Sequence, residues 1–104
     1  MRKDVINERL LSVYKTIGNN ISRLRGRMNQ EELAQKAGIS RSTIYAAEQG
    51  ESIALETLVK IADALGVHPA DLFLTEQDQR GVSYKSKLVL QRLFDVMGID
   101  DKKI

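Results

Sequence analysis

One short segment of the chain places polar side chains on the outer face of a predicted helix. In an α-helix each residue is rotated by about 100° from the one before it, so a helix that begins at Arg41 has one side that faces away from the core. The residues on that outer side are Arg41, Ser42, Tyr45, Ala46 and Gln49. A guanidinium can donate two hydrogen bonds to O6 and N7 of guanine, and an alanine methyl group can contact thymine. These residues predict a helix that reads base pairs in the major groove of DNA. For Arg41, a contact with phosphate or solvent is the alternative.

The residues before this helix predict a second short helix and a tight turn. Asn29 and Glu32 form an Asn-x-x-Glu capping box that starts a helix, and Gly38 can adopt the positive φ that ends it. Ser40 then caps the helix that follows. Small and apolar residues face inward at Leu33, Ala34, Ala37, Ile39, Ile44 and Ala47. The spacing predicts a helix-turn-helix from Gln30 to Gln49, with a helical hairpin serving only as core as the alternative.

Apolar residues three and four apart predict helices in the rest of the chain as well, so the expected fold is all-α. These helices span about residues 4–25, 55–66, 69–74 and 83–97. The first is one helix or two, because Gly18 and its neighbours permit a bend. In the helix that begins near Leu55, the stripe expected to be buried is Leu55, Leu58, Ile61, Ala62 and Leu65. Pro69 suits the first position of a short helix, with His68 at its start.

The pattern divides the chain into four parts. They are an N-terminal helical extension (1–16), the DNA-binding domain (17–74), a linker (75–82) and a C-terminal helix with its tail (83–104). The last helix carries an apolar face formed by Leu90, Leu93, Phe94 and Met97. We expect this face to contribute to self-association. The alternative is that it packs within the monomer on Val5, Ile6 and Leu10.

Charge is segregated along the chain, although the formal net charge is only +2. Residues 1–45 carry nine basic and four acidic side chains (+5), residues 46–78 carry one and seven (−6), and residues 79–104 carry six and three (+3). Basic surface supplies contacts with the phosphate backbone. The pattern is compatible with DNA binding, but solvated helix faces show similar unevenness.

The sequence offers little for catalysis or metal binding. It contains one histidine and no cysteine, and it lacks P-loop, GxSxG and HExxH motifs. We therefore expect no enzyme activity, no metal site and no cofactor. Its longest apolar runs are too short to span a bilayer. We expect a cytoplasmic protein with no membrane partner.

The chain resembles the helix-turn-helix domains of lambdoid phage repressors and Cro proteins, the XRE family. The resemblance covers residues 17–73, in the stretches IGNNISRLR, NQEELAQKAGIS, RSTIYAAEQG, LETLVKIADALGV and PADLF. It implies a compact five-helix fold, here with the N-terminal helical extension and the additional C-terminal helix. It also implies a transcriptional repressor that binds double-stranded DNA as a homodimer, at a near-palindromic operator and without a cofactor.

The resemblance assigns roles to individual residues. It implies base contacts for Arg41, Ser42 and Ala46, and Tyr45 lies on the same outer side. It also implies that Gln30 holds phosphate at the start of the first motif helix. Further contacts with the DNA backbone are expected from Thr43, Gln49 and Ser52. Glu51 beside Ser52 would repel phosphate if it faced DNA. Either the loop after Gly50 turns away, or affinity is modest and the contacts come from Ser52 and backbone amides.

A structural ion pair is expected between Arg25 and Glu48. Arg25 follows Ile21 by four residues and so shares the buried face of its helix. The resemblance pairs this arginine with the glutamate near the end of the second motif helix. An alignment with the family that allows no gap would give this role to Arg23 instead. The position of Arg25 on the buried stripe of the helix favours Arg25.

Several functions stay open at this point. A protein-interaction adaptor that kept the fold but lost DNA contact is a rival, and the acidic residues 46–78 favour it mildly. Among DNA-binding functions, the sequence does not separate a phage repressor, an antitoxin, a restriction-modification controller and a housekeeping regulator.

Overall fold

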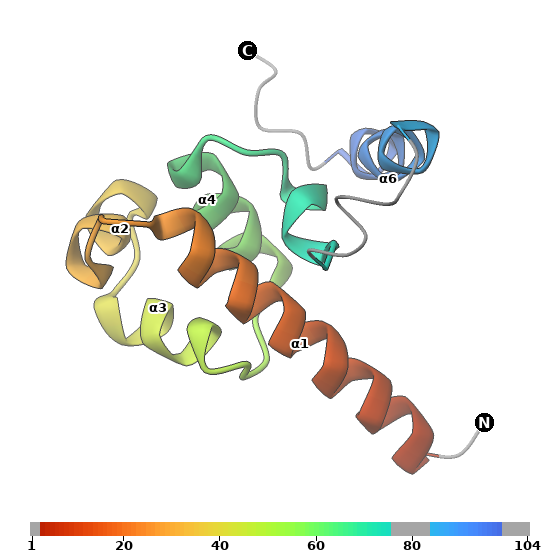
Figure 1. Ribbon diagram of the computed structural model, residues 1–104, viewed down its shortest axis with the longest axis horizontal. Coiled ribbons are helices and arrows are strands. Elements are labelled where there is room, and N and C mark those ends of the chain that lie inside the picture. The colour runs from red at the N-terminus through yellow and green to blue at the C-terminus, as the bar shows by residue number, and fades with distance from the viewer. Residues whose placement is uncertain (1–2, 76–83, 99–104) are drawn as a thin grey trace.

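The chain folds into helices throughout residues 3–75 and 84–98, the part that the computed structural model describes. In chain order the elements are α1 (Lys3–Arg25), α2 (Gln30–Ala37), α3 (Arg41–Glu48), α4 (Leu55–Leu65), the 3-10 helix η1 (Pro69–Phe73) and α6 (Tyr84–Val96). The described residues form no strand (Figure 1). The predicted all-α fold is confirmed.

One hydrophobic core joins α1, α2, α3, α4 and η1. Each helix contributes the apolar residues that its periodicity predicts for the inner face. The buried residues of this core are Ile17, Ile21, Leu33, Ala34, Ile44, Ala47, Leu58, Ile61, Ala62 and Leu72. Helices α2 and α3 both pack against the remaining helices of the domain, α2 on α4 and α3 on α1. The core therefore fixes the outer faces of both motif helices.

Local capping sets the limits of α2 and α3 as the sequence predicts. The side chain of Asn29 accepts a hydrogen bond from the backbone N–H of Glu32, and the Glu32 side chain accepts one from the N–H of Asn29. Gly38 ends α2 in the left-handed region with φ of 73°, which glycine adopts without steric cost. Ser40 then caps α3 by accepting a hydrogen bond from the N–H of Thr43. The turn between the two helices is thus specified by its own residues.

The first element is one continuous helix, so the bend that Gly18 permits does not occur. Gly18 serves close packing instead. A Cβ atom at this position would lie 2.5 Å from the carbonyl oxygen of Ala47 and 2.8 Å from that of Glu48. Both contacts are too short for a methyl group, and both involve backbone atoms. The missing side chain of Gly18 lets α1 approach the C-terminal end of α3.

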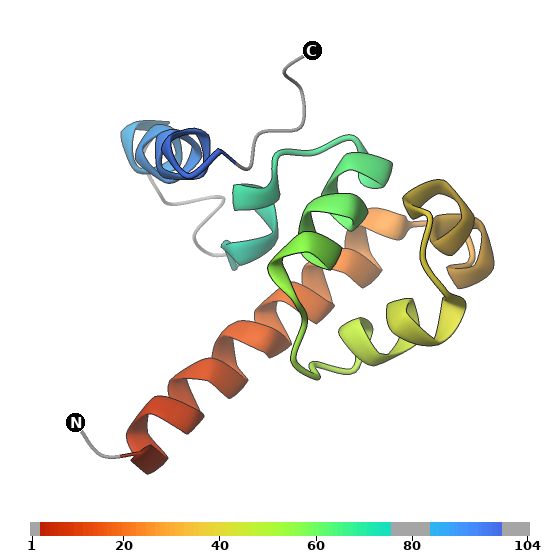
Figure 2. The same cartoon turned by 180° about the vertical axis from the view of Figure 1, so that it is seen from behind.

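The N-terminal half of α1 projects away from the domain (Figures 1 and 2). Tyr14 packs against the core and Ile17 is buried in it, whereas Leu10 and Val13 on the preceding turns are 44% and 38% exposed. Continuous apolar periodicity along α1 therefore does not mean continuous burial, because the rest of the domain covers only the second half of the helix.

One residue predicted to be buried is exposed. Leu55 lies on the expected stripe of α4 but is 44% exposed, and the buried residues of this helix begin at Leu58. The periodicity gave the correct face, but the first turn of α4 extends beyond the elements that cover it. The prediction for Leu55 was therefore wrong.

The C-terminal helix α6 packs on η1 through Phe94. The Phe94 ring lies 5.8 Å from the ring of His68, edge to face, and 5.6 Å from the ring of Phe73. These contacts place part of the predicted apolar face against the domain, at η1. The expected linker 75–82 lies outside the described residues apart from Thr75, as do the side chains of Val5 and Ile6.

We predict that Gly18→Ala lowers the free energy of unfolding by about 1–3 kcal/mol, because the added methyl group overpacks the contact between α1 and α3. Helix propensity alone would favour alanine at this position by up to about 1 kcal/mol. Chemical denaturation measures the effect, with Asn19→Ala on the exposed side of the same turn as the control. A variant at position 18 as stable as the native protein would contradict this account of the contact.

Candidate nucleic-acid interface

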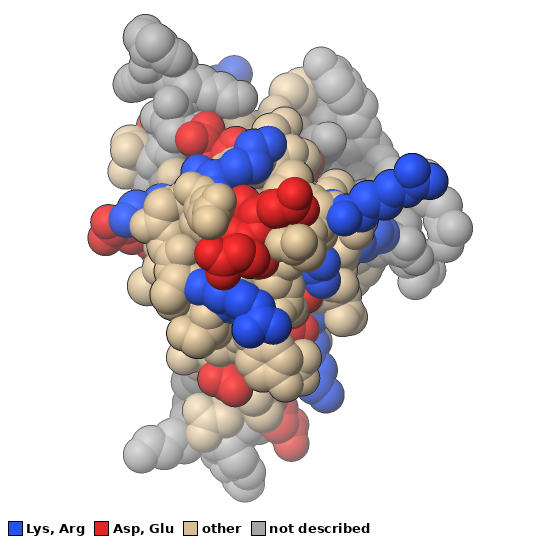
Figure 3. All heavy atoms as spheres, turned by 90° about the vertical axis from the view of Figure 1, so that its left-hand side faces the viewer, with Lys and Arg blue, Asp and Glu red and all other residues tan. Residues whose placement is uncertain are grey.

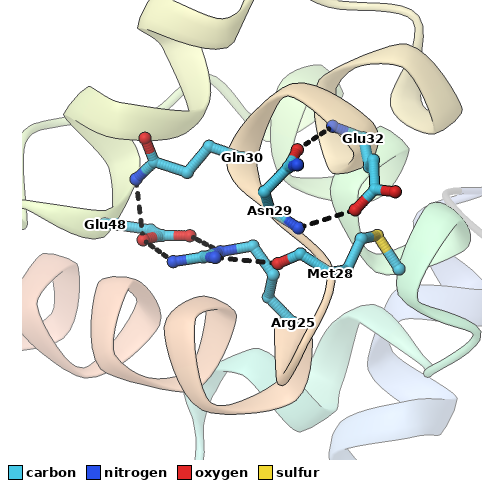
Figure 4. A network of polar contacts seen from close by, with 6 residues as sticks. All are labelled: Arg25, Met28, Asn29, Gln30, Glu32 and Glu48. Carbon is cyan, nitrogen blue, oxygen red and sulfur yellow. Dashed lines mark hydrogen bonds and ion pairs between the residues drawn. The ribbon is translucent and has the colours of Figure 1, made fainter.

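The carboxylate of Glu48 lies at the meeting point of α1, α2 and α3 (Figure 4). Arg25 donates from Nε to Glu48 Oε2 at 2.7 Å and from Nη2 to Oε1 at 2.9 Å. Its Nη1 donates to the carbonyl oxygen of Met28 at 2.8 Å. The two side chains are 19% and 6% exposed, respectively. The structure therefore brings Arg25 and Glu48 together as a bidentate, largely buried ion pair.

The electrostatics of this pair keep both partners in place. The hydrogen bond with Glu48 raises the pKa of Arg25 above its ordinary value and outweighs the opposing effect of burial. Because an arginine guanidinium is not deprotonated in proteins, its hydrogen bonds to Glu48 are charge-assisted. Since Glu48 belongs to the last turn of α3, this charge fixes the C-terminal end of α3 against α1.

The amide of Gln30 joins the same network. Its Nε2 donates to Glu48 Oε1 at 3.0 Å, so the side chain contacts α3 as well as forming part of the first turn of α2. Its expected contact with phosphate stays a prediction. The structure adds a role for Gln30 in holding the two motif helices together.

The residues predicted to read bases lie on the outer side of α3. Arg41, Ser42 and Gln49 are exposed, Tyr45 is 53% exposed, and Ala46 is half-buried. An open hollow of about 470 Å³ brings Arg41 together with Gln30 and is also lined by Arg25, Asn29 and Glu31. The side chains of Arg41 and Gln30 thus border the same hollow.

Hydroxyl groups form a cluster at the start of α3. Ser40 Oγ lies 3.1 Å from Ser42 Oγ and 2.8 Å from Thr43 Oγ1. Ser42 is exposed and Thr43 is half-buried, so both positions retain access from outside. The cluster orients these hydroxyls before any ligand arrives, which lowers the entropic cost of a contact.

The chain turns back over the end of α3. The N–H of Gly50 donates to Ala47 O and that of Glu51 donates to Ala46 O, each at 3.1 Å. Glu51 and Ser52 are both exposed in the loop that follows. The structure therefore does not bury the carboxylate of Glu51, and Ser52 stays available for the predicted backbone contact.

Charges on the face around α2 are mixed rather than uniformly basic. Acidic side chains occupy the centre of this face, and basic side chains lie above and below them (Figure 3). Glu31 and Glu32 in the first turn of α2 are exposed. Acidic groups repel phosphate, so DNA contacts are expected from the side of α3 rather than from the middle of this face.

Sequence reasoning missed the part played by Asn20. This side chain is buried, and its Nδ2 donates to the carbonyl oxygens of Leu72 at 2.9 Å and Leu74 at 2.7 Å. Arg23 Nη2 donates to its Oδ1 at 2.9 Å. Asn20 therefore connects α1 to the end of η1. An asparagine within an apolar helical stripe was the available signal.

Residues 3–75 and 84–98 contain no group of three or more His, Cys, Asp or Glu residues that could hold a metal ion. None of the described helices combines the length and the apolar character needed to cross a membrane.

Sequence comparison places this architecture in a family. Residues 22–72 match the family described as helix-turn-helix. The chain is 43% identical over 53 residues to an uncharacterised HTH-type transcriptional regulator of Methanocaldococcus jannaschii, covering 50% of this chain and 80% of that one. It is also 43% identical over 53 residues to an uncharacterised HTH-type transcriptional regulator of Methanothermobacter thermautotrophicus, covering 49% and 77%. No solved structure shows significant similarity to it.

The protein therefore belongs to the XRE-type helix-turn-helix family of DNA-binding proteins. The matched residues include α2, α3, the turn between them and both partners of the ion pair. The projecting half of α1 and the whole of α6 lie outside the match.

We predict that Glu48→Ala lowers the free energy of unfolding by about 2–4 kcal/mol, because it leaves the Arg25 guanidinium partly buried without its counter-charge. Equilibrium denaturation with urea measures the loss. Glu51→Ala, an exposed glutamate three residues further on, is the matched control and should change stability by no more than about 0.5 kcal/mol. Equal stability of both variants would refute a structural role for the pair.

Proposed function

We propose that this protein is a sequence-specific transcriptional repressor that binds a near-palindromic operator in double-stranded DNA as a homodimer. The observation that carries the proposal is the geometry of α3. Its inner side is buried and its C-terminal end is fixed by Arg25 and Glu48, while its outer side presents polar residues to solvent. A rigid helix with an exposed polar face is what major-groove reading requires.

Within this proposal, the outer residues of α3 divide into two groups. Arg41, Ser42, Tyr45 and Ala46 read base edges, with Arg41 donating both hydrogen bonds to one guanine. The residues that contact the sugar-phosphate backbone are Gln30, Thr43, Gln49 and Ser52. Backbone contacts set the position of the protein on the duplex, and the base contacts give it sequence preference.

Homodimerisation follows from the small size of the reading surface. One helix of eight residues, as in α3, covers only a few base pairs. Two copies related by a two-fold axis read two half-sites one helical turn apart, about 34–36 Å, or at a multiple of that distance. Repression would follow from an operator within a promoter, because the bound dimer would exclude the transcription machinery. Within this proposal, the protein acts in the cytoplasm.

The acidic centre of the α2 face favours a second candidate, an adaptor that binds a protein through this fold. The two functions differ in their response to salt. A DNA-binding protein that contacts several phosphates loses affinity steeply as salt rises, because condensed counterions are released on binding. Affinity for DNA that is weak and independent of sequence would favour the adaptor.

We predict that Arg41→Ala weakens binding to the preferred DNA sequence by roughly 5- to 150-fold, as expected for loss of one bidentate base contact. Affinity for random DNA should fall much less, and preference at one base position in each half-site should relax. Fluorescence anisotropy on both kinds of duplex measures this. Lys36→Ala, an exposed basic residue in the last turn of α2, controls for the loss of one positive charge. Equal losses on both duplexes would reassign Arg41 to phosphate.

A further inference from the structure

The middle of α1 lies against the C-terminal end of α3 (Figure 1). Gly18 faces the last carbonyl groups of α3, and Lys15, one turn earlier on α1, lies against the residue that follows this end. A Cβ atom at Gly50 would be 3.2 Å from Lys15 Cγ and 3.4 Å from Lys15 Cα. Gly50 is buried, whereas Lys15 is exposed. Lys15 therefore packs the stem of its side chain on Gly50 and keeps its ammonium group accessible.

This contact places a cation at one end of the proposed reading surface. Gly50 directly follows Gln49, the last residue on the outer side of α3, and it precedes the exposed loop residues Glu51 and Ser52. Ser52 is among the residues assigned above to the DNA backbone. Lys15 therefore borders the loop that carries one of the proposed backbone contacts, although it belongs to a different helix.

Helix α3 and its loop supply little positive charge at this end. Arg41 lies at the start of α3, and the next basic residue along the chain is Lys60. The last turn of α3 contains no basic residue, and the loop after it adds the exposed carboxylate of Glu51. The charge of Glu48 is already paired with Arg25. A phosphate group beside this end of α3 would thus meet a net negative charge unless another element supplied a cation.

We propose that Lys15 contacts a phosphate group of the DNA backbone at the C-terminal end of α3. This inference rests on the proposed function and adds a contact from α1 to it. Residue 15 precedes the residues 22–72 that match the helix-turn-helix family, so the contact extends the DNA-binding surface beyond the matched motif. Phosphate contacts add affinity and fix the position of a protein on the duplex without reading its sequence. Lys15 accordingly raises affinity for every duplex, whereas Arg41 sets the preference among them.

A purely structural role is the alternative for Lys15. The C-terminal end of a helix attracts a cation through the helix dipole, and the carboxylate of Glu51 belongs to the adjacent loop. However, none of the ion pairs among the described residues involves Lys15 or Glu51. A phosphate group gives the ammonium group of Lys15 a partner of opposite charge, and this attraction offsets the repulsion between the same phosphate and Glu51.

Lys15→Gln tests the contact, because it removes the charge and keeps the Cγ atom that lies against Gly50. Fluorescence anisotropy measures the affinity of the native and variant proteins for a duplex of random sequence over a range of salt concentrations. Each phosphate contact contributes about 0.9 to the slope of log affinity against log salt. We expect a slope shallower by about 0.9 per bound chain in the variant. The advantage of the native protein then narrows by roughly threefold per chain between about 50 and about 200 mM salt.

Two control variants separate this contact from a general effect of charge. Lys60→Gln removes the same charge from an exposed lysine on α4 and should keep the native slope. Lys15→Arg restores the charge at position 15 and should restore the slope. The ratio of affinities for the preferred and the random duplex should be the same in Lys15→Gln as in the native protein. A native slope in Lys15→Gln would overturn the proposal, and so would an equal change of slope in Lys60→Gln.

The structural alternative gives a different pattern of results. If Lys15 only stabilises the end of α3, Lys15→Gln lowers the midpoint of urea denaturation and leaves the salt slope native, which contradicts the phosphate contact. If Lys15 contacts DNA, Glu51→Gln strengthens binding, because it removes a repulsive carboxylate from the same place. Unchanged affinity in Glu51→Gln would overturn this placement of the DNA.

The same measurements distinguish this contact from the proposed function on which it rests. A native protein that binds no duplex would refute both. A native protein that prefers one DNA sequence, together with a Lys15→Gln variant that keeps the native salt slope, would refute the Lys15 contact alone.

Discussion

The position of α3, the second helix of the helix-turn-helix, depends on one carboxylate. Glu48 accepts hydrogen bonds from Arg25 on α1 and from Gln30 on α2, so a single side chain at the end of α3 connects the three helices. Removing either Arg25 or Glu48 lowers the free energy of unfolding by more than the intact ion pair contributes to it, because the remaining charge stays buried without its partner. The structure thus makes the orientation of α3, and with it any sequence preference, depend on an interaction that does not itself contact DNA.

Much of this arrangement could be predicted from the sequence because it is determined locally. Asn29 with Glu32, Ser40 and Gly38 set the ends of α2 and α3 through contacts within a few residues, and these are the contacts that sequence patterns encode. Helical periodicity also distinguished Arg25 from Arg23 as the residue on the inner face. The partner of Arg25 came from resemblance to a family, since no local rule connects residues 23 positions apart.

What the sequence did not predict depends on contacts between distant elements. Gly18 looked like a site for a bend, but its role is set by the carbonyl groups of α3. Asn20 looked like a poor helix former, but it holds the end of η1. Leu55 is exposed because its turn extends beyond its neighbours. In each case the residue's own helix was predicted correctly, whereas the tertiary surroundings that decide its role were not.

Helices α2 and α3 lie at one side of the molecule, and the projecting half of α1 and helix α6 lie at the other (Figure 1). The central claim is that the outer side of α3 reads DNA sequence. Selection of bound duplexes from a random pool, followed by affinity measurements over a range of salt concentrations, tests it most directly. The account predicts enrichment of two inverted half-sites at a fixed spacing, with affinity that falls as salt rises. A pool that stays random after selection would contradict it.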